Sequence, residues 1–235
     1  MQDQENVNPS GGNKAYSAEL TSLIAFLVLL AFLGVQFISY ATVITIDEAF
    51  KNFTLPVDAT SVSLMASAIA GTLVILFFLG MWKFNIREYL ALKSFSISQL
   101  LLWTIIYMGF LGILYLLRGY FQEEIDFVQQ LVDSARFLPL LFFAIVIAGP
   151  FFEEALLRGF VFKGLKNTVL GVSGTIIVTS LIFSVLHVVQ YEFLFLIPIF
   201  FGGVILGMAR HYSGSLWVPF ILHAIHNFTS IVYLM

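Results

Sequence analysis

The sequence predicts an all-α fold: a polytopic transmembrane helical bundle of about seven spans. Of its 235 residues, 60% are hydrophobic and only 11% are charged, far below the roughly one quarter of charged residues in soluble domains. Several apolar runs also approach the ~20 residues that a helix needs to cross a bilayer. So few charges could not cover the surface of a soluble protein, so we expect the lipid bilayer as its environment. The net charge of −3 gives no indication of nucleic acid as a partner.

The chain divides into a polar tail and one membrane domain. Residues 1–15 are rich in Asn, Gln and Gly and predict a disordered N-terminal tail. Residues 16–235 predict a single transmembrane domain, because the loops between apolar runs are short. The expected spans are, in order, Leu20–Ile46, Val62–Trp82, Leu100–Leu117, Phe137–Phe152 with a continuation, Thr175–Gln190, Phe193–Ala209 and Leu216–Met235.

Short glycine and proline motifs add detail to the prediction for three of these spans. Gly149-Pro150 predicts a kink in the fourth. The stretch Gly171–Gly174 resembles the G-x-S-G of rhomboid serine proteases, but we interpret it as the turn and cap that start the fifth. Gly203 and Gly207 form G-x-x-x-G in the sixth and predict close helix packing.

Loop charges predict the orientation. Eight of the eleven basic residues fall on one side of the membrane: Lys14, Lys83, Arg87, Lys93, Arg158, Lys163, Lys166 and Arg210. The opposite side holds Lys51, Arg118 and Arg136 together with the acids Asp47, Glu48, Asp58, Glu123, Glu124, Asp126 and Asp133. The positive-inside rule then places the N-terminus in the cytoplasm and the C-terminus outside.

Polar residues inside the last spans indicate a functional site. Glu153, Glu154 and Arg158 lie within six positions of an apolar run, at a cost on the order of 8–10 kcal/mol if all were unpaired in lipid. Glu154 and Arg158 are four residues apart and can pair on one helix face, whereas Glu153 points about 100° away. Helical rise places Glu153, His187 and Asn227 at similar depths, about 18–20 Å from the same membrane face. Such groups would seek one another or a water cavity.

Three motifs resemble a known family. They are E-E-x-x-x-R at Glu153–Arg158, F-x-x-x-H at Phe183–His187 and H-x-x-x-N at His223–Asn227, in this order and on separate spans. The pattern resembles the CAAX-processing and bacteriocin-immunity family of intramembrane glutamic proteases, which includes the Ras-converting endopeptidase of eukaryotes. The resemblance covers about 75 residues and implies a protease core at residues 137–235. The first three spans carry no motif that we can match to the family.

The resemblance implies a role for each motif residue. Glu153 would activate water, and His187 would hold that water. His223 and Asn227 would donate hydrogen bonds to the oxyanion. Glu154 and Arg158 would fix the geometry through their ion pair, and Phe183 would shape the wall of the pocket. No cofactor and no metal are implied, although Glu153, His187 and His223 could make a His₂Glu metal set.

Other interpretations stay open. Asn227 could join helices, and His226, which the family pattern does not require, could bond a backbone carbonyl. The absence of H-E-x-x-H argues against a zinc protease of the site-two type, and the absence of cysteine excludes a cysteine nucleophile. The protein could also be a non-catalytic immunity protein, a peptide binder or a small transporter.

The expected substrate is the C-terminus of a peptide or protein, prenylated in the manner of CAAX proteins or belonging to another class. A bacterial plasma membrane is the expected location, ahead of the endoplasmic reticulum.

Overall fold

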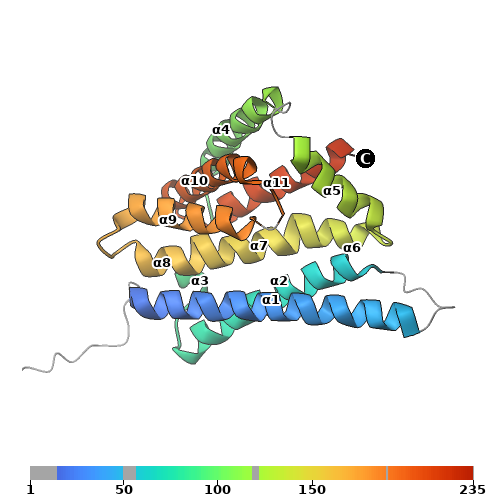
Figure 1. Ribbon diagram of the computed structural model, residues 1–235. Helices are drawn as coiled ribbons and strands as arrows, with labels where there is room; N and C mark the ends of the chain where they lie inside the picture. Colours follow the sequence, from blue (N-terminus) through green and yellow to red (C-terminus); the bar gives the residue numbers. More distant parts are fainter. Residues whose placement is uncertain (1–14, 50–56, 118–121, 189, 235) are drawn as a thin grey trace, which may run out of the picture.

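The computed structural model describes residues 15–49, 57–117, 122–188 and 190–234. All regular elements in these ranges are helical, which confirms the all-α class (Figure 1). The predicted tail falls almost entirely outside them. The elements are α1 (Ala18–Ala49), α2 (Ala59–Met81), α3 (Ile86–Tyr89), α4 (Ile97–Leu116), α5 (Gln122–Ser134), α6 (Leu138–Phe143), η2 (Ala144–Ala148), α7 (Gly149–Glu154), η3 (Ala155–Val161), α8 (Phe162–Leu165), α9 (Gly171–Leu186), η4 (Phe193–Phe195), α10 (Leu196–Ser213) and α11 (Trp217–Leu234).

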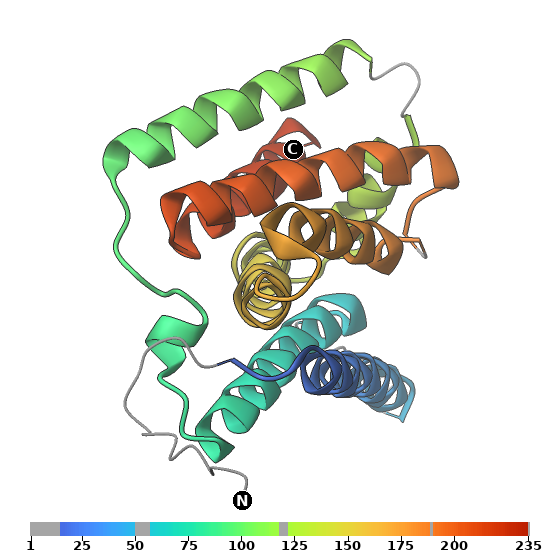
Figure 2. The same ribbon diagram turned by 90° about the vertical axis from the view of Figure 1, so that its left-hand side faces the viewer.

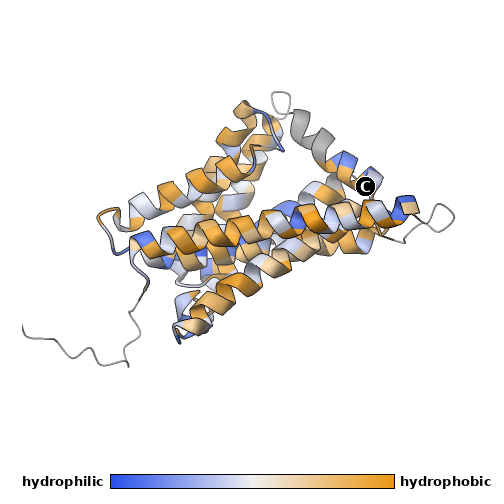
Figure 3. Cartoon of the chain, turned by 60° about the horizontal axis from the view of Figure 1, so that its bottom comes forward, coloured by the Kyte–Doolittle hydropathy of each residue, from blue (hydrophilic) through white to orange (hydrophobic). Residues whose placement is uncertain are grey.

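Seven apolar helices correspond to the seven predicted spans. Five in the described part of the chain are long and apolar enough to cross a membrane: Ala18–Ala49, Ala59–Met81, Ile97–Leu116, Leu138–Leu165 and Phe193–Ser213. Gly171–Leu186 and Trp217–Val232 are apolar but shorter. Large apolar side chains face outward, for example Phe37 on α1 and Ile105 on α4, and hydrophobic residues predominate along most of the helices (Figure 3). The chain is therefore a multi-pass membrane protein.

The helices surround one central rod, the continuous helix from α6 to α8. Figure 2 shows α1 and α2 as a pair on one side of this rod, and α9, α10 and α11 on the other, with α4 farthest out. Gly71 of α2 allows a close approach to the rod, because a Cβ there would lie 2.3 Å from the ring of Phe152. The stacked ring of Phe32, with centroids 4.7 Å apart, covers Phe152 from α1. The rod is thus the element that both halves of the bundle share.

The rod passes through Pro150 without breaking, and two of its segments are π-helical. The first, η2, ends directly before Gly149-Pro150. Proline has no backbone N–H to donate, and a π-helical turn is a common way for a helix to absorb such an irregularity. The second, η3, contains Arg158. Because the helix continues to Leu165, the glutamates lie well inside the bundle, as their predicted depth requires.

Helices α3 and α5 were not predicted. The acidic residues of this segment predict a loop, yet Val128, Leu131 and Val132 lie at helical spacing in it. Val128 is buried against Val146 of the rod and Ile231 of α11. A thirteen-residue helix with one apolar face is too short and too polar to register as a span, which is why a search for long apolar runs missed it.

Two local expectations are confirmed. Helix α9 begins at Gly171, which has a φ of 57°, so the Gly171–Gly174 stretch is a helix start. Gly203 and Gly207 face α9 at close range: a Cβ on Gly203 would lie 3.1 Å from the Cβ of Ser180, and one on Gly207 would lie 3.0 Å from Ile176. The G-x-x-x-G motif therefore brings two helices together.

Candidate active site

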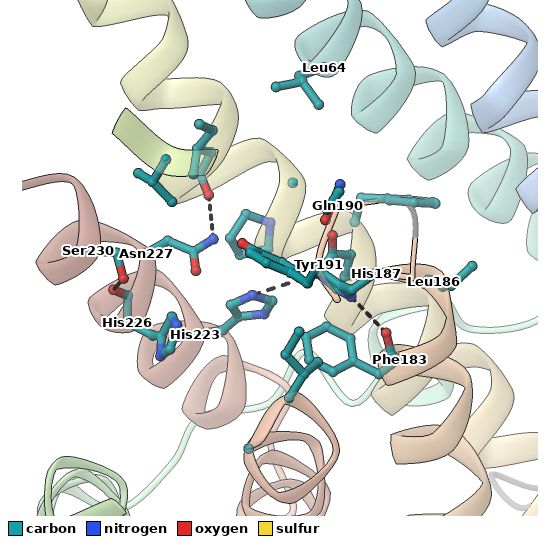
Figure 4. A pocket seen from close by; sticks show the side chains of 18 of the residues that line it. Leu64, Phe183, Leu186, His187, Gln190, Tyr191, His223, His226, Asn227 and Ser230 are labelled. Atoms are coloured by element: carbon teal, nitrogen blue, oxygen red, sulfur yellow. Dashed lines mark hydrogen bonds and ion pairs between the residues drawn. The ribbon is translucent and has the colours of Figure 1, made fainter. Parts of the chain in front are cut away.

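A cavity of about 560 Å³ lies beside the rod and holds the predicted polar residues. Glu153 of α7, His187 after α9, and His223 and Asn227 of α11 all line it. Figure 4 shows His187, His223 and Asn227 around one space. Residues of α1, α2, α4 and α5 complete the walls, for example Phe32, Leu64, Phe110 and Leu131. The structure therefore brings the four polar residues together in one cavity, to whose walls helices of the N-terminal half also contribute.

The two adjacent glutamates occupy different environments. The side chain of Glu153 keeps 27% of its surface exposed and lines the cavity, whereas the side chain of Glu154 is fully buried. The helix turns about 100° between neighbouring residues, which aims one carboxylate at the cavity and the other at the protein interior. Of the two carboxylates, only that of Glu153 lines the cavity.

Glu154 and Arg158 form the expected ion pair. Arg158 Nη1 lies 2.9 Å from Glu154 Oε1, and both side chains are fully buried. Arg158 also donates from Nη2 to the carbonyl oxygen of Gly203, at 2.9 Å, and its guanidinium lies 4.8 Å from the ring centre of Phe183. This pair ties the rod to α9 and α10, the helices that support the cavity.

His223 contacts both glutamates. Its Nδ1 lies 3.1 Å from Glu154 Oε1, and its Nε2 lies 3.7 Å from Glu153 Oε2. Because a carboxylate oxygen accepts, Nδ1 carries the proton of the shorter contact. Nε2 is left facing the carboxylate that lines the cavity. The sequence predicts separate roles for the two glutamates, and in the structure a single imidazole from α11 contacts both.

His187 lies at the end of α9 and not inside it. The fifth span was predicted to run to Gln190, but the helix ends at Leu186 and His187 is its C-cap. The Nδ1 of His187 donates to the carbonyl oxygen of Phe183, at 2.7 Å. A neutral imidazole with its proton on Nδ1 presents Nε2 as an acceptor. The Phe183 ring packs edge-on against both histidines, with centroids 4.7 Å from His187 and 5.5 Å from His223, so it forms the wall between them.

Asn227 joins α11 to the rod. Its Nδ2 donates to the carbonyl oxygen of Ile145, in the π-helical segment η2, at 2.9 Å. The interhelical contact that the sequence left open as an alternative is thus present. The amide has a second N–H, so the contact leaves a donor for the cavity.

Tyr107 of α4 is a cavity residue that the sequence analysis missed. Its hydroxyl lies 3.5 Å from Nδ1 of His226, and both residues line the cavity. The contact gives His226 a side-chain neighbour. A tyrosine inside an apolar span needs a partner for its hydroxyl, and this need is the signal that could have drawn attention to Tyr107.

A metal site needs several ligands close together and aimed at one point. Within the described ranges, no group of three or more His, Asp or Glu side chains could hold a metal ion. The possible His₂Glu set is therefore not formed by the residues as they lie here.

A bundle of membrane-crossing helices with buried carboxylates and histidines beside an internal cavity defines a multi-pass membrane protein with a polar site inside the bilayer. Residues 135–229 match the family described as type II CAAX prenyl endopeptidase Rce1-like, and all residues of the three motifs fall within this range. The chain is also 37% identical over 105 residues to the membrane-embedded CAAX protease MroQ of Staphylococcus aureus (strain USA300). No solved structure matches the chain.

The C-terminal part of the chain is therefore similar to CAAX-type membrane proteases. The aligned stretch covers 42% of this chain and 41% of the Staphylococcus protein. The chain thus aligns with less than half the length of the curated relative that it matches.

Proposed function

We propose that the protein is an intramembrane endopeptidase of the CAAX type, which hydrolyses peptide bonds with a water molecule activated by Glu153. The observation that carries the proposal is the division between the glutamates: Glu153 lines the cavity, while the buried Glu154 is paired with Arg158. A general base must reach the proton that it removes, and of the two carboxylates only Glu153 can do so.

The first step needs a held and polarised water. Glu153 would accept one proton of the water while the oxygen attacks the scissile carbonyl carbon. His187, with Nδ1 donating to Phe183, presents Nε2 as an acceptor for the other water proton. Two acceptors on one water orient its lone pair toward the carbonyl, which is the positional effect that hydrolysis requires.

The second requirement is stabilisation of the oxyanion. With Nδ1 of His223 bonded to Glu154, donation to the oxyanion would come from a proton on Nε2, which faces the cavity side of the ring. Asn227 supplies its second amide N–H. The proton taken by Glu153 would then pass to the leaving amine. Donors of this kind are worth about 10²–10³ in kcat.

The substrate that fits is the C-terminal segment of a membrane-associated peptide or protein. The cavity is lined mainly by apolar side chains, including several from helices α1, α2 and α4, so an apolar or prenylated segment could enter from the bilayer. We place the N-terminus in the cytoplasm and the C-terminus outside on the strength of the loop charges. A bacterial plasma membrane is the proposed location.

The test is cleavage of a peptide panel by the purified protein in liposomes, read by mass spectrometry. The panel holds prenylated CAAX peptides, their unprenylated forms and short membrane-active peptides. Three proteins are compared: the wild type, Glu153→Gln and Glu192→Gln. Glu192 is an exposed carboxylate that is not among the residues lining the cavity, so it controls for the chemical change itself.

Cleavage that is lost in Glu153→Gln, kept in Glu192→Gln and resistant to chelator would support the proposal. Loss on addition of chelator would instead indicate a metalloprotease. If folded wild-type protein cleaves nothing in the panel, the non-catalytic immunity or peptide-binding alternative is favoured.

A further inference from the structure

Four basic side chains gather at the end of the bundle where α8 and α10 finish. Lys163 lies in α8, Lys166 caps that helix, Arg210 lies in the last turn of α10, and Lys93 lies in the loop between α3 and α4. Figure 1 shows α3 and α8 at this same end. None of the four lines the cavity. We call this group the basic cluster.

Backbone contacts hold the cluster in place. Arg210 Nε donates to the carbonyl oxygen of Arg158 at 3.0 Å, and its guanidinium lies 5.5 Å from the ring centre of Phe162. The loop that carries Lys93 is fixed to the start of α11, because Ser215 Oγ donates to the carbonyl oxygen of Lys93 at 2.6 Å. The positions of the charges are therefore set by the fold.

No carboxylate in the described part of the chain forms an ion pair with the cluster. Arg210 is 6% exposed, yet within the described part of the chain no carboxylate lies within 4.0 Å of it or of the three lysines. The carboxylate of Glu88 attracts Lys163 electrostatically, but it lies more than 4.0 Å away. Burial lowers the pKa of Lys166, and the positive charges of Lys163, Arg210 and Lys93 lower it further. This repulsion between neighbouring basic side chains indicates an anion-binding site.

The usual distribution of basic residues in membrane proteins explains only part of the cluster. Cations are favoured at helix C-termini and in cytoplasmic loops, which accounts for exposed lysines. Neither effect accounts for a buried guanidinium without a counter-ion, since buried charges are normally paired. Arg210 has one N–H committed to a carbonyl, and the remaining donors of its planar fork suit a phosphate group.

We propose that the basic cluster binds a negatively charged phosphate group. Two membrane-crossing helices, Leu138–Leu165 and Phe193–Ser213, end at the cluster, so it lies at the level of the lipid headgroups. The phosphate of an anionic phospholipid is therefore the expected source, and free phosphate from solution is the other. The proposal is independent of the catalytic one and of the orientation of the chain.

The test is native mass spectrometry of the full chain, with phosphatidylglycerol and phosphatidylcholine of identical acyl chains and, in a separate arm, inorganic phosphate. Each basic residue near an anionic surface contributes about fivefold to binding. The double variant Lys93→Gln/Lys166→Gln should therefore lower the retention of phosphatidylglycerol by roughly ten- to thirtyfold. Arg210→Gln is a second variant, and the lysine pair carries the test if that variant does not fold.

Lys83→Gln is the matched control, because Lys83 is an exposed lysine outside the cluster. Preference for phosphatidylglycerol that falls in the double variant and persists in the control supports a headgroup site. Displacement by inorganic phosphate without any lipid preference supports a phosphate site that is filled from solution. Equal retention of both lipids with no effect of phosphate, or a preference unchanged in the double variant, overturns the proposal.

Discussion

His223 Nδ1 lies 3.1 Å from Glu154 Oε1, the same oxygen that Arg158 Nη1 approaches to 2.9 Å. One buried carboxylate oxygen therefore receives a donor from its own helix and another from α11. Glu154 fixes the position of His223, although it does not itself line the cavity.

Glu154→Gln should destabilise the protein. The amide oxygen could still accept, but the buried Arg158 would lose its counter-charge, and breaking a buried pair costs about 3–5 kcal/mol. We expect a clearly lower midpoint of thermal unfolding in detergent, with loss of any peptidase activity. The shape-matched change Gln190→Glu, at an exposed position on the cavity wall, should leave the midpoint nearly unchanged. An unchanged midpoint in Glu154→Gln would show that the pair contributes little.

Glu153→Gln should separate activity from stability. The carboxylate is partly exposed, and its contact with His223 is 3.7 Å, too long for a direct hydrogen bond. We expect the unfolding midpoint to stay close to that of the wild type while the cleavage rate falls by about 10²–10⁴, the usual contribution of a general base. Paired thermal and kinetic measurements on one preparation check this. Full activity in the variant would remove Glu153 from the mechanism.

Gly203→Ala should disturb the site from a distance. The added Cβ would lie 3.1 Å from Ser180 Cβ and 3.2 Å from Arg158 Nη2, so α10 must move away from α9 and from the guanidinium. Overpacking of this kind costs about 1–3 kcal/mol, which thermal unfolding would reveal. Gly112→Ala, where no atom lies within 4 Å of the new Cβ, is the control. Equal midpoints for the two variants would contradict the close packing.

Asn227→Leu should distinguish the two roles of this residue. Loss of the bond to Ile145 alone should cost only about 0.6 kcal/mol, the average for interhelical hydrogen bonds in membranes. Loss of an oxyanion donor should lower kcat by about 10²–10³ with little change in KM. Thr229→Val, which removes a hydroxyl that donates to the carbonyl oxygen of His226, controls for polar loss on the same helix. A small effect on kcat would leave Asn227 as a purely structural contact.

The prediction of the fold succeeded where the bilayer imposes the pattern. A spanning helix must be long and apolar, so Leu20–Ile46 and Val62–Trp82 were found close to the observed α1 and α2. The prediction failed for α5, which is short and has one polar face, and at the end of α9, where His187 caps the helix. Spans were predicted from long apolar runs, and neither a short helix with one polar face nor the exact end of a helix can be recognised in such a run.

The sequence by itself determined the apolar spans, the pairing of Glu154 with Arg158 and the separation of that pair from Glu153. Helical periodicity sets which side chains of one helix share a face, so these relationships are local. Only the tertiary structure decided that His223 contacts both glutamates, that Asn227 bonds Ile145 and that Tyr107 reaches His226. These contacts join different helices, and they depend on how each helix is rotated and crossed against its neighbours, which the spacing of residues along a single helix does not specify.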